Sequence, residues 1–248
     1  MFESWLQRFR EGDRLALSRL LTWISRGQHL DQIRAALAGR TTDAQVIAIT
    51  GSAGVGKSSL IGKLVEVLRQ RGESVAVLAC DPASPLTGGA LLGDRIRMPS
   101  LPDDNGLFIR SLAVPSGQQG VATNIDLMVS LCGSFGFDCV IVETVGAGQG
   151  DTAIGEMADI VVVLVQPETG DDLQWEKAGL LEIADVVVVH KSDLPAAARV
   201  ETHVREALTL SEGKNIEVVR ASATKGEGIA ELCDVLQQHK KTNQPTTG

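Results

Sequence analysis

A glycine-rich loop between a strand-like run and a helical pattern constrains the fold more than any other stretch. Residues 46–60 read VIAITGSAGVGKSSL and match G-x-x-x-x-G-K-[S/T]. The β-branched run before the loop predicts a buried strand, and Leu60, Leu64 and Leu68 continue at helical spacing. Such loops bind phosphate, because their backbone amides point at phosphate oxygens at the positive end of the helix. A loop that merely turns the chain is the alternative.

The residue types in this loop suggest a role for each position. Glycine at position 51 allows the tight turn, and Gly54 and Gly56 let the backbone approach the phosphates closely. We expect Lys57 to reach the β- and γ-phosphates of a nucleotide and the Ser58 hydroxyl to bind Mg²⁺. The residues predicted to surround the phosphates are Gly51, Ala53, Gly54, Val55, Gly56, Lys57, Ser58 and Ser59.

Composition narrows the class of protein. The 248-residue chain is 44% hydrophobic but only 3% aromatic, so we expect an aliphatic core. A net charge of −8 argues against a nucleic-acid partner, which would require a clustered basic surface. No apolar run reaches the roughly 18 residues of a membrane span, and the N-terminus lacks a signal-peptide pattern. We therefore expect no membrane partner. The four scattered cysteines are typical of a reducing compartment, so we expect a cytoplasmic protein.

Strand-like and helical patterns alternate from residue 46 to about 240. This alternation predicts an α/β fold with a doubly wound, mostly parallel sheet of about seven strands. Ligands of such sheets bind at the carboxyl ends of the strands. The expected strands are 46–50, 75–80, 107–112, 138–143, 160–166, 185–190 and 216–221. The expected helices are 57–71, 119–133, 173–183, 196–210 and 226–239.

The N-terminal segment is expected to form a helical extension. Two helices are predicted, with a stop at Gly27. The extension is interpreted as a cap packed on the main domain; a partner-docking face is the alternative, because Trp5 and Trp23 lie among arginines. The apolar faces comprise Phe2, Leu6 and Phe9 in the first helix and Leu17, Leu20, Leu21 and Ile24 in the second. The predicted domains are a helical extension at 1–43, a nucleotide-binding domain at 44–240 and a flexible tail at 241–248.

Two acidic residues follow the second predicted strand. Asp81 comes directly after VAVLAC, and Asp94 lies thirteen residues later in DPASPLTGGALLGDRIRM. A carboxylate at a strand end that faces the glycine-rich loop can hold Mg²⁺ directly or through water. The alternative for Asp81 is that it caps a turn before Pro82.

A third acid, Glu143, ends the strand FDCVIVE and opens the motif E-T-V-G, in which Gly146 is the glycine. GTPases generally have D-x-x-G here, with the acid near Mg²⁺ and the glycine amide on the γ-phosphate. The next residue is Ala147, so the water-orienting Gln of Ras is absent, and we expect slow hydrolysis until a partner completes the site. The predicted catalytic residues are Lys57, Asp94, Glu143 and Gly146. The predicted Mg²⁺ ligands among these motifs are Ser58, Asp81 and Glu143.

A further motif, His190-Lys191-Ser192-Asp193, follows a run of four valines where GTPases carry N-K-x-D. Asp193 is expected to accept hydrogen bonds from guanine N1–H and the exocyclic amine, a donor pair that adenine lacks. His190 replaces Asn, which leaves open the contacts to guanine N7 and to the glycine-rich loop, although an imidazole can donate one hydrogen bond. After the last strand, Ser222, Ala223 and Thr224 are similar to the loop whose amides face guanine O6. A solvated turn is the alternative for 190–193.

Taken together, these motifs resemble the MeaB/ArgK family of P-loop GTPases over roughly residues 12–230. The resemblance implies a fold of the SIMIBI type, with GTP or GDP and Mg²⁺ as ligands. It implies Mg²⁺ roles for Ser58, Asp81, Asp94 and Glu143. It also implies a partner, an adenosylcobalamin-dependent acyl-CoA mutase, whose cofactor loading and protection the family assists. Switch roles are implied around Arg97, at 146–149 and at 171–177, although an ordinary helix start is the alternative for the last segment. The motifs are GSAGVGKSS, DPASPLTGGALLGDRIRM, FIRS, ETVGAGQGD, ETGDDLQWEKAGLLEIAD and HKSD.

Several alternatives remain beside this resemblance. Ser52-Ala53 stand where a proline is usual, and the sequence ends where family members continue into a helical dimerisation arm. A homodimer is therefore left open, as is the client, which is methylmalonyl-CoA mutase or a 2-hydroxyisobutyryl- or isobutyryl-CoA mutase. A nickel- or other metal-insertion GTPase would require a His-rich tract or clustered Cys and His ligands. A kinase and a nucleotide-gated binding module with negligible turnover are the other candidates.

Overall fold

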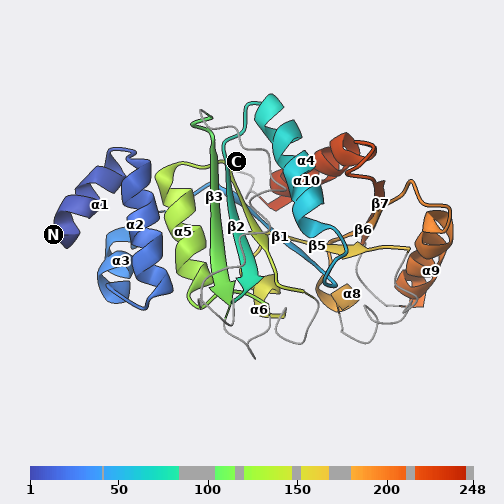
Figure 1. Cartoon of the computed structure of the whole chain (residues 1–248), viewed down its shortest axis with the longest axis horizontal. Helices are drawn as coiled ribbons and strands as arrows, with labels where there is room; N and C mark the ends of the chain where they lie inside the picture. The colour runs from blue at the N-terminus through green and yellow to red at the C-terminus, as the bar shows by residue number, and fades with distance from the viewer. Residues whose placement is uncertain are drawn as a thin grey trace.

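The computed structural model describes residues 1–40, 42–83, 104–114, 120–146, 152–167, 180–210 and 216–243. Within these ranges the chain forms a seven-stranded sheet with helices on both faces (Figure 1). The predictions for Asp94, for the segment around Arg97, for 147–149 and for 171–177 lie outside the described residues.

Every strand of the sheet runs parallel to its neighbours, in the order β3-β2-β4-β1-β5-β6-β7. This confirms the predicted parallel sheet. The observed strand ends lie within one or two residues of the predicted ones, because continuous buried runs such as IVVVLV mark strands that are covered on both faces. The strands are β1 Gln45–Gly51, β2 Val75–Pro82, β3 Leu107–Val114, β4 Cys139–Glu143, β5 Ile160–Val165, β6 Val186–His190 and β7 Glu217–Ala221.

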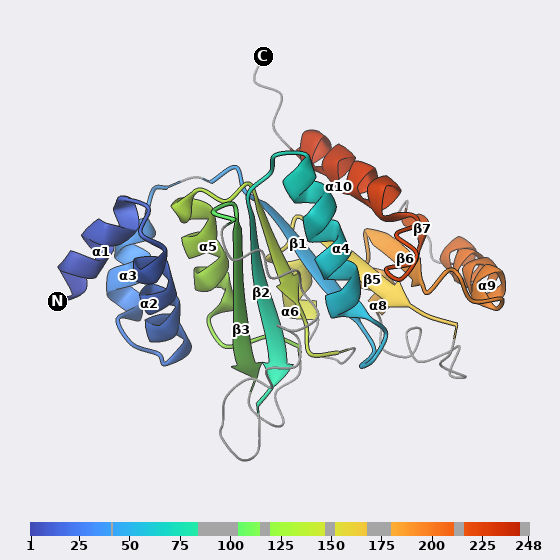
Figure 2. The same ribbon diagram turned by 45° about the horizontal axis from the view of Figure 1, so that its top comes forward.

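The helices cover the two faces of the sheet, so the sheet is doubly wound as predicted. On one face, α4 and α10 lie side by side, and their apolar residues share a core with alternate residues of the strands (Figures 1 and 2). On the other face, α5 and α9 pack over a second aliphatic core. The helices are α1 Phe2–Arg10, α2 Arg14–Ser25, α3 Leu30–Leu37, α4 Lys57–Gln70, α5 Ile125–Phe135, α6 Thr152–Gly155, α8 Leu180–Ile183, α9 Ala197–Leu210 and α10 Ile229–Asn243.

The N-terminal segment contains three helices, so the prediction of two is wrong. Asp13 caps the start of α2, where its side chain accepts a hydrogen bond of 2.8 Å from the backbone N–H of Leu15. Beyond Gly27, which has φ +67° and ends α2 as predicted, the chain forms α3. This helix has eight residues, of which Ile33 and Leu37 are buried. Two apolar residues four positions apart are too few to indicate a helix from the sequence.

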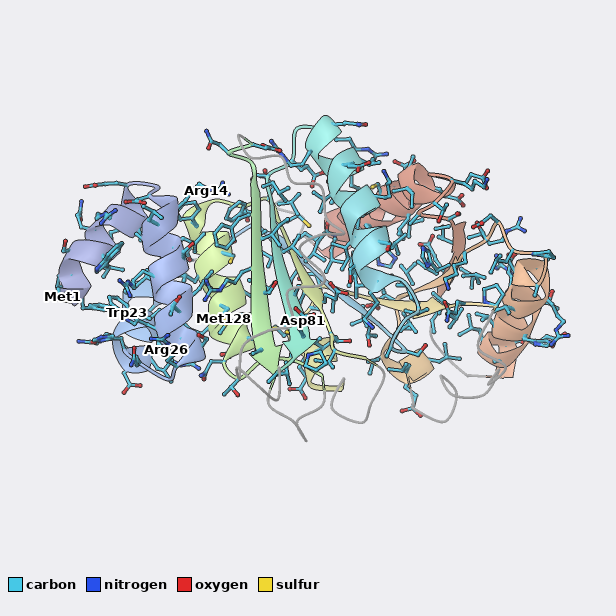
Figure 3. All side chains as sticks on the ribbon, in the orientation of Figure 1. Met1, Arg14, Trp23, Arg26, Asp81 and Met128 are labelled. Atoms are coloured by element: carbon cyan, nitrogen blue, oxygen red, sulfur yellow. The ribbon has the colours of Figure 1, made fainter. Side chains whose placement is uncertain are left out.

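The three N-terminal helices pack on the outer side of α5 (Figure 2). Their buried residues belong to the same core as those of α5, and the rings of Phe9 and Phe135 lie 5.5 Å apart. Arg14, labelled in Figure 3, donates hydrogen bonds to the carbonyl oxygens of Asn105 and Leu107 at the start of β3. These contacts fit a cap that packs on the sheet domain. Among the described residues, none of the helices combines the length and the apolar character required to cross a membrane.

Two other predicted helices begin too early. The predicted helix at 119–133 begins at Ile125, because Asn124 before it adopts the left-handed conformation with φ +58°. The predicted helix at 226–239 begins at Ile229, after Gly228 at φ +72°, and continues to Asn243, past the predicted domain end at 240. A Cβ on Gly228 would lie 1.8 Å from the Arg220 carbonyl oxygen, so a tight turn must come first.

The packing of α2 makes a testable prediction. Leu20 is fully buried, whereas Leu15 of the same helix is 69% exposed. Replacing Leu20 by Ala should lower the free energy of unfolding by about 2–5 kcal/mol, because the core loses buried methyl groups and gains a cavity. The same change at Leu15 should cost less than about 0.5 kcal/mol. Urea unfolding of both variants checks this, and equal losses would contradict the placement of α2.

Candidate nucleotide-binding site

The glycine-rich loop, residues 51–58, connects β1 in the middle of the sheet to α4. Its first glycine, Gly51, has φ +147°, and a Cβ there would lie 2.6 Å from the carbonyl oxygen of Leu164 on β5. Only glycine fits this close approach of two strands. Ala53 and Gly54 are exposed, whereas Val55 is buried. The loop therefore leaves the sheet at its carboxyl edge and presents its backbone at the tip.

Lys57 begins α4 and is 7% exposed. Its Nζ atom donates hydrogen bonds to the carbonyl oxygens of Gly51, at 2.9 Å, and Ser52, at 3.2 Å. The ammonium group is thus held over the loop at the N-terminus of a 14-residue helix. Helix N-termini carry unsatisfied N–H groups and a partial positive charge, so lysine and helix together favour an anion here.

A second polar pair lies beside the loop. Ser58 Oγ donates a 2.8 Å hydrogen bond to Oε1 of Glu143 at the end of β4, and both side chains are buried. The pairing of β1 with β4 explains this contact, because Ile49 lies opposite Glu143 and the loop follows two residues later. A hydroxyl and a carboxylate at this distance offer oxygen atoms of the kind that Mg²⁺ binds.

The segment after Glu143 returns toward the loop. Thr144 donates from its backbone N–H to the Ile49 carbonyl oxygen, and its hydroxyl donates a buried hydrogen bond of 3.0 Å to Thr50. A Cβ built on Gly146 would lie 3.5 Å from the backbone nitrogen of Ala53, so this glycine packs close to the loop. Sequence reasoning missed the Thr50–Thr144 pair; aligning the ends of the two strands would have revealed it.

Asp81 lies near the end of β2 and is 5% exposed (Figure 3). Strand register places Ala79 opposite Glu143, so Asp81 is two residues further along in the strand direction. Both acids therefore lie at the carboxyl edge. In the described part of the chain, no three His, Cys, Asp or Glu side chains form a group that could hold a metal ion. A Mg²⁺ ion in a nucleotide site requires only one or two protein carboxylates, since the phosphates supply further ligands.

His190, at the end of β6, connects the glycine-rich loop to the loop after β7. Its Nδ1 atom lies 2.8 Å from the Val55 carbonyl oxygen, and its Nε2 atom accepts a hydrogen bond of 3.4 Å from the Ala223 N–H. Burial lowers the pKa of this histidine below its usual value of 6.5, and the charge of Lys191 acts in the same direction. The hydrogen bond to Val55 and the charge of Asp193 raise the pKa, but these two effects together are smaller than the effects that lower it.

The turn after His190 presents Asp193 to solvent. Lys191 adopts φ +54°, and Ser192 donates from its backbone to Ala221. Ser222 Oγ donates a 2.6 Å hydrogen bond to Asp193 Oδ1, which holds the pKa of that carboxyl below its usual range. We name residues 222–224 the base loop; in it Ala223 is buried and Thr224 is exposed. The turn and the base loop are thus joined.

The structure brings the described candidates to one edge of the sheet. Ser58 is bonded to Glu143, and His190 links the glycine-rich loop to the base loop. Asp81 lies at the same edge, and Asp94 lies outside the described residues. A glycine-rich loop after the central strand of a doubly wound sheet, followed by a lysine at a helix N-terminus, defines the class of P-loop nucleotide-binding proteins.

Comparison with known families shows which family of P-loop proteins this chain belongs to. The family model of the methylmalonyl-CoA mutase-associated GTPase MeaB matches residues 17–248. The chain therefore belongs to the MeaB family of GTPases, which confirms the resemblance inferred from the motifs. A "probable GTPase" of Mycobacterium bovis is 39% identical in an alignment of 250 positions that covers 94% of this chain and 73% of that protein.

Two further similarities agree with this family. The mitochondrial methylmalonic aciduria type A homolog of Mus musculus is 36% identical over 245 residues, covering 96% of this chain and 57% of that protein. The crystal structure of a LAO/AO transport system kinase superposes with a TM-score of 0.75 at 27% identity. That similarity covers 97% of this chain and 75% of the other.

The burial of His190 predicts a pH-dependent stability. Above the usual pKa of 6.5 the histidine is neutral in both states. As the pH falls below that value, the unfolded chain takes up the proton first, because the folded-state pKa is lower. The free energy of unfolding should therefore fall until the pH passes the folded-state pKa, and His190→Asn should remove this part of the fall.

Urea unfolding at about pH 7.5 and about pH 5.5 checks this prediction. The charged groups that act on His190 are Lys191 and Asp193 of its own turn, and the packed loops contribute the backbone of Val55 and Ala223. His203→Asn, in α9, is the matched control. Wild-type and His190→Asn profiles that run parallel across this range would show that His190 does not titrate differently on folding.

Proposed function

We propose that this protein binds GTP with Mg²⁺ across the carboxyl edge of its sheet. It hydrolyses the nucleotide slowly and assists an adenosylcobalamin-dependent acyl-CoA mutase. The observation that carries the nucleotide part is the hydrogen bond from His190 to the Val55 carbonyl oxygen. This bond joins the glycine-rich loop to the turn that ends in Asp193, so a phosphate-binding element and a base-binding element form one site.

On the phosphate side, Lys57 is proposed to leave the carbonyl oxygens of Gly51 and Ser52 and to pair with the β- and γ-phosphates. These two bonds are to neutral carbonyl oxygens, whereas the phosphates carry full charge, so the exchange favours the nucleotide. Backbone amides of residues 54–59 and the N-terminus of α4 would complete the phosphate site.

The oxygen atoms beside the loop fit Mg²⁺. Ser58 and Glu143 already lie within hydrogen-bond distance, and the buried carboxylate of Asp81 lies at the same edge. We assign Ser58, Glu143 and Asp81 to the ion, and the resemblance adds Asp94. When bound, Mg²⁺ neutralises charge on the phosphate oxygens. Ser58 would turn its hydroxyl proton away from Glu143, which frees an oxygen lone pair of each for the cation.

On the base side, Asp193 is proposed to accept hydrogen bonds from N1–H and the exocyclic amine of guanine. An aspartate carboxylate is ionised at neutral pH, and the Ser222 hydroxyl, which lowers its pKa further, fixes one of its oxygens. The amides of Ala223 and Thr224 are assigned to guanine O6 by the resemblance. An ionised acceptor gives strong discrimination, because adenine would leave it facing an unprotonated N1.

Hydrolysis is proposed to be slow in the isolated protein. Glu143 and the Gly146 amide would face the Mg²⁺ ion and the γ-phosphate. The residue after Gly146 is Ala147, which cannot orient a water molecule through a side chain amide. A partner would then supply or order the missing group. The rate of GTP hydrolysis would therefore rise when the complex forms.

The proposed partner follows from the family. The family description associates its GTPases with methylmalonyl-CoA mutase, and the mouse relative is named for methylmalonic aciduria. We propose an acyl-CoA mutase of this cobalamin-dependent class in the cytoplasm, with the isobutyryl- and 2-hydroxyisobutyryl-CoA mutases as further clients to compare. Cofactor loading and protection of the mutase are the proposed task.

Base selectivity tests the nucleotide part of the proposal. Wild-type protein should bind a fluorescent GTP analogue far more tightly than the matching ATP analogue. Asp193→Asn should lower GTP affinity by about 10²-fold or more, since two hydrogen bonds to a charged acceptor are lost. The same variant should favour XTP, because the amide N–H₂ can donate to the carbonyl oxygen at C2 of xanthine.

The control for this experiment is Glu231→Gln, which removes an exposed negative charge from α10 and should leave the affinity for GTP unchanged. Equal affinity of the wild-type protein for GTP and ATP would overturn the assignment of guanine. A loss of GTP affinity in Asp193→Asn without any gain for XTP would place Asp193 away from the base.

Single-turnover hydrolysis tests the partner. Without a partner the rate should stay below about 1 s⁻¹; unassisted Ras, for scale, hydrolyses at about 10⁻⁴ s⁻¹. Purified methylmalonyl-, isobutyryl- and 2-hydroxyisobutyryl-CoA mutases are added in turn, and one of them should accelerate phosphate release. A faster rate of GTP hydrolysis by the protein alone would contradict the proposal that its catalytic site is incomplete.

Two other outcomes of this experiment select the alternatives. A GTP-dependent complex with a mutase that releases no phosphate would indicate a nucleotide-gated binding module. Transfer of labelled phosphate to an acceptor other than water would indicate a kinase. The same assays therefore separate all three classes of function.

A further inference from the structure

We infer that His190 uses both of its ring nitrogens to hold the protein together, so that no side-chain donor from this position reaches purine N7. This inference rests on the proposed binding of GTP. It assigns His190 as a positioning residue of the site and restricts guanine recognition to the edge that carries O6, N1 and the exocyclic amine.

The contacts of the ring determine its tautomer. The Val55 carbonyl oxygen can only accept a hydrogen bond, so the Nδ1 atom at 2.8 Å must carry the proton. The Ala223 backbone N–H can only donate, so Nε2 at 3.4 Å must offer its lone pair. A neutral imidazole has one N–H and one lone pair, and here both are engaged by backbone groups.

The ring has no freedom to turn toward a ligand. His190 is 3% exposed and lies opposite Ala221 in the pairing of β6 with β7. On its other side, a Cβ built on Gly56 would lie 2.6 Å from the ring atom Cε1. The imidazole therefore packs directly on the backbone of the glycine-rich loop, and a rotation would break both hydrogen bonds in a buried place, at a cost for each unpaired group.

An asparagine at this position would behave differently. Its amide has two N–H donors and one acceptor oxygen, so it can bond the loop carbonyl and still donate to a purine N7. Histidine keeps the bond between the two loops and loses the second donor. The substitution thus separates two tasks, positioning and base contact, which an asparagine at the same place can combine.

The probe for this inference is 7-deaza-GTP, in which N7 is replaced by C–H while the edge facing Asp193 is unchanged. Wild-type protein should bind 7-deaza-GTP and GTP with nearly equal affinity. His190→Asn should bind GTP in preference to 7-deaza-GTP by about two- to tenfold, the size of one hydrogen bond. His203→Asn, the matched control in α9, should give the wild-type ratio.

The outcomes separate this inference from the proposed function. A wild-type protein that prefers GTP to ATP but also penalises 7-deaza-GTP several-fold would overturn the inference and leave the proposed function intact. A protein without any preference for guanine would overturn the proposed function. A His190→Asn variant with the same ratio as wild type would also count against the inference, because the added donor would then not face N7.

A measurement on the wild-type protein covers the case in which His190→Asn does not fold. Long-range ¹H–¹⁵N NMR of the wild-type protein distinguishes the two neutral tautomers and the imidazolium, and the sequence has only four histidines. The His190 ring should show a protonated Nδ1 and an unprotonated Nε2 near pH 7, with and without GTP. A protonated Nε2, or a change of tautomer when GTP binds, would overturn the inference.

Discussion

The parallel pairing of β1 with β4 on one side and β5 on the other determines where the candidate site lies. The register sets Ile49 opposite Glu143 and Gly51 opposite Leu164. Because parallel strands end at the same edge, the loop after β1 and the acid that ends β4 must meet there. The Ser58–Glu143 hydrogen bond is a consequence of this register, and a slip of one residue would turn the carboxylate to the other face of the sheet.

Buried polar groups gather at the same carboxyl edge of the sheet. Among the described residues, every buried polar side chain except Gln45 lies at or just beyond the carboxyl ends of the strands. Two aliphatic cores occupy the rest of the sheet, and there a polar group would cost free energy. Lys57 and Glu143 are buried at this edge with hydrogen bonds that compensate the loss of water. Such a concentration of buried ionisable groups is typical of a functional site.

The sequence predicts the sheet well and the helix boundaries less well, for physical reasons. Strands buried on both faces require continuous apolar runs, and such a run can be recognised in the sequence without knowing which strand pairs with it. The start of α5 depends on Asn124 at φ +58°, and α3 has only eight residues, so neither leaves a periodic signal. In the site, the motifs located Ser58 and Glu143, but His190 could be paired with Val55 and Ala223 only in three dimensions.

Histidine at position 190 connects the two loops of the candidate site. A rigid ring spans the distance between the glycine-rich loop and the base loop, and each of its two nitrogens bonds one of them, so a single residue holds both. In the proposed site, selection of guanine then depends on Asp193, which Ser222 holds in place. One ionised acceptor suffices for that task, because guanine offers it two donors and adenine presents an acceptor where one of them would be.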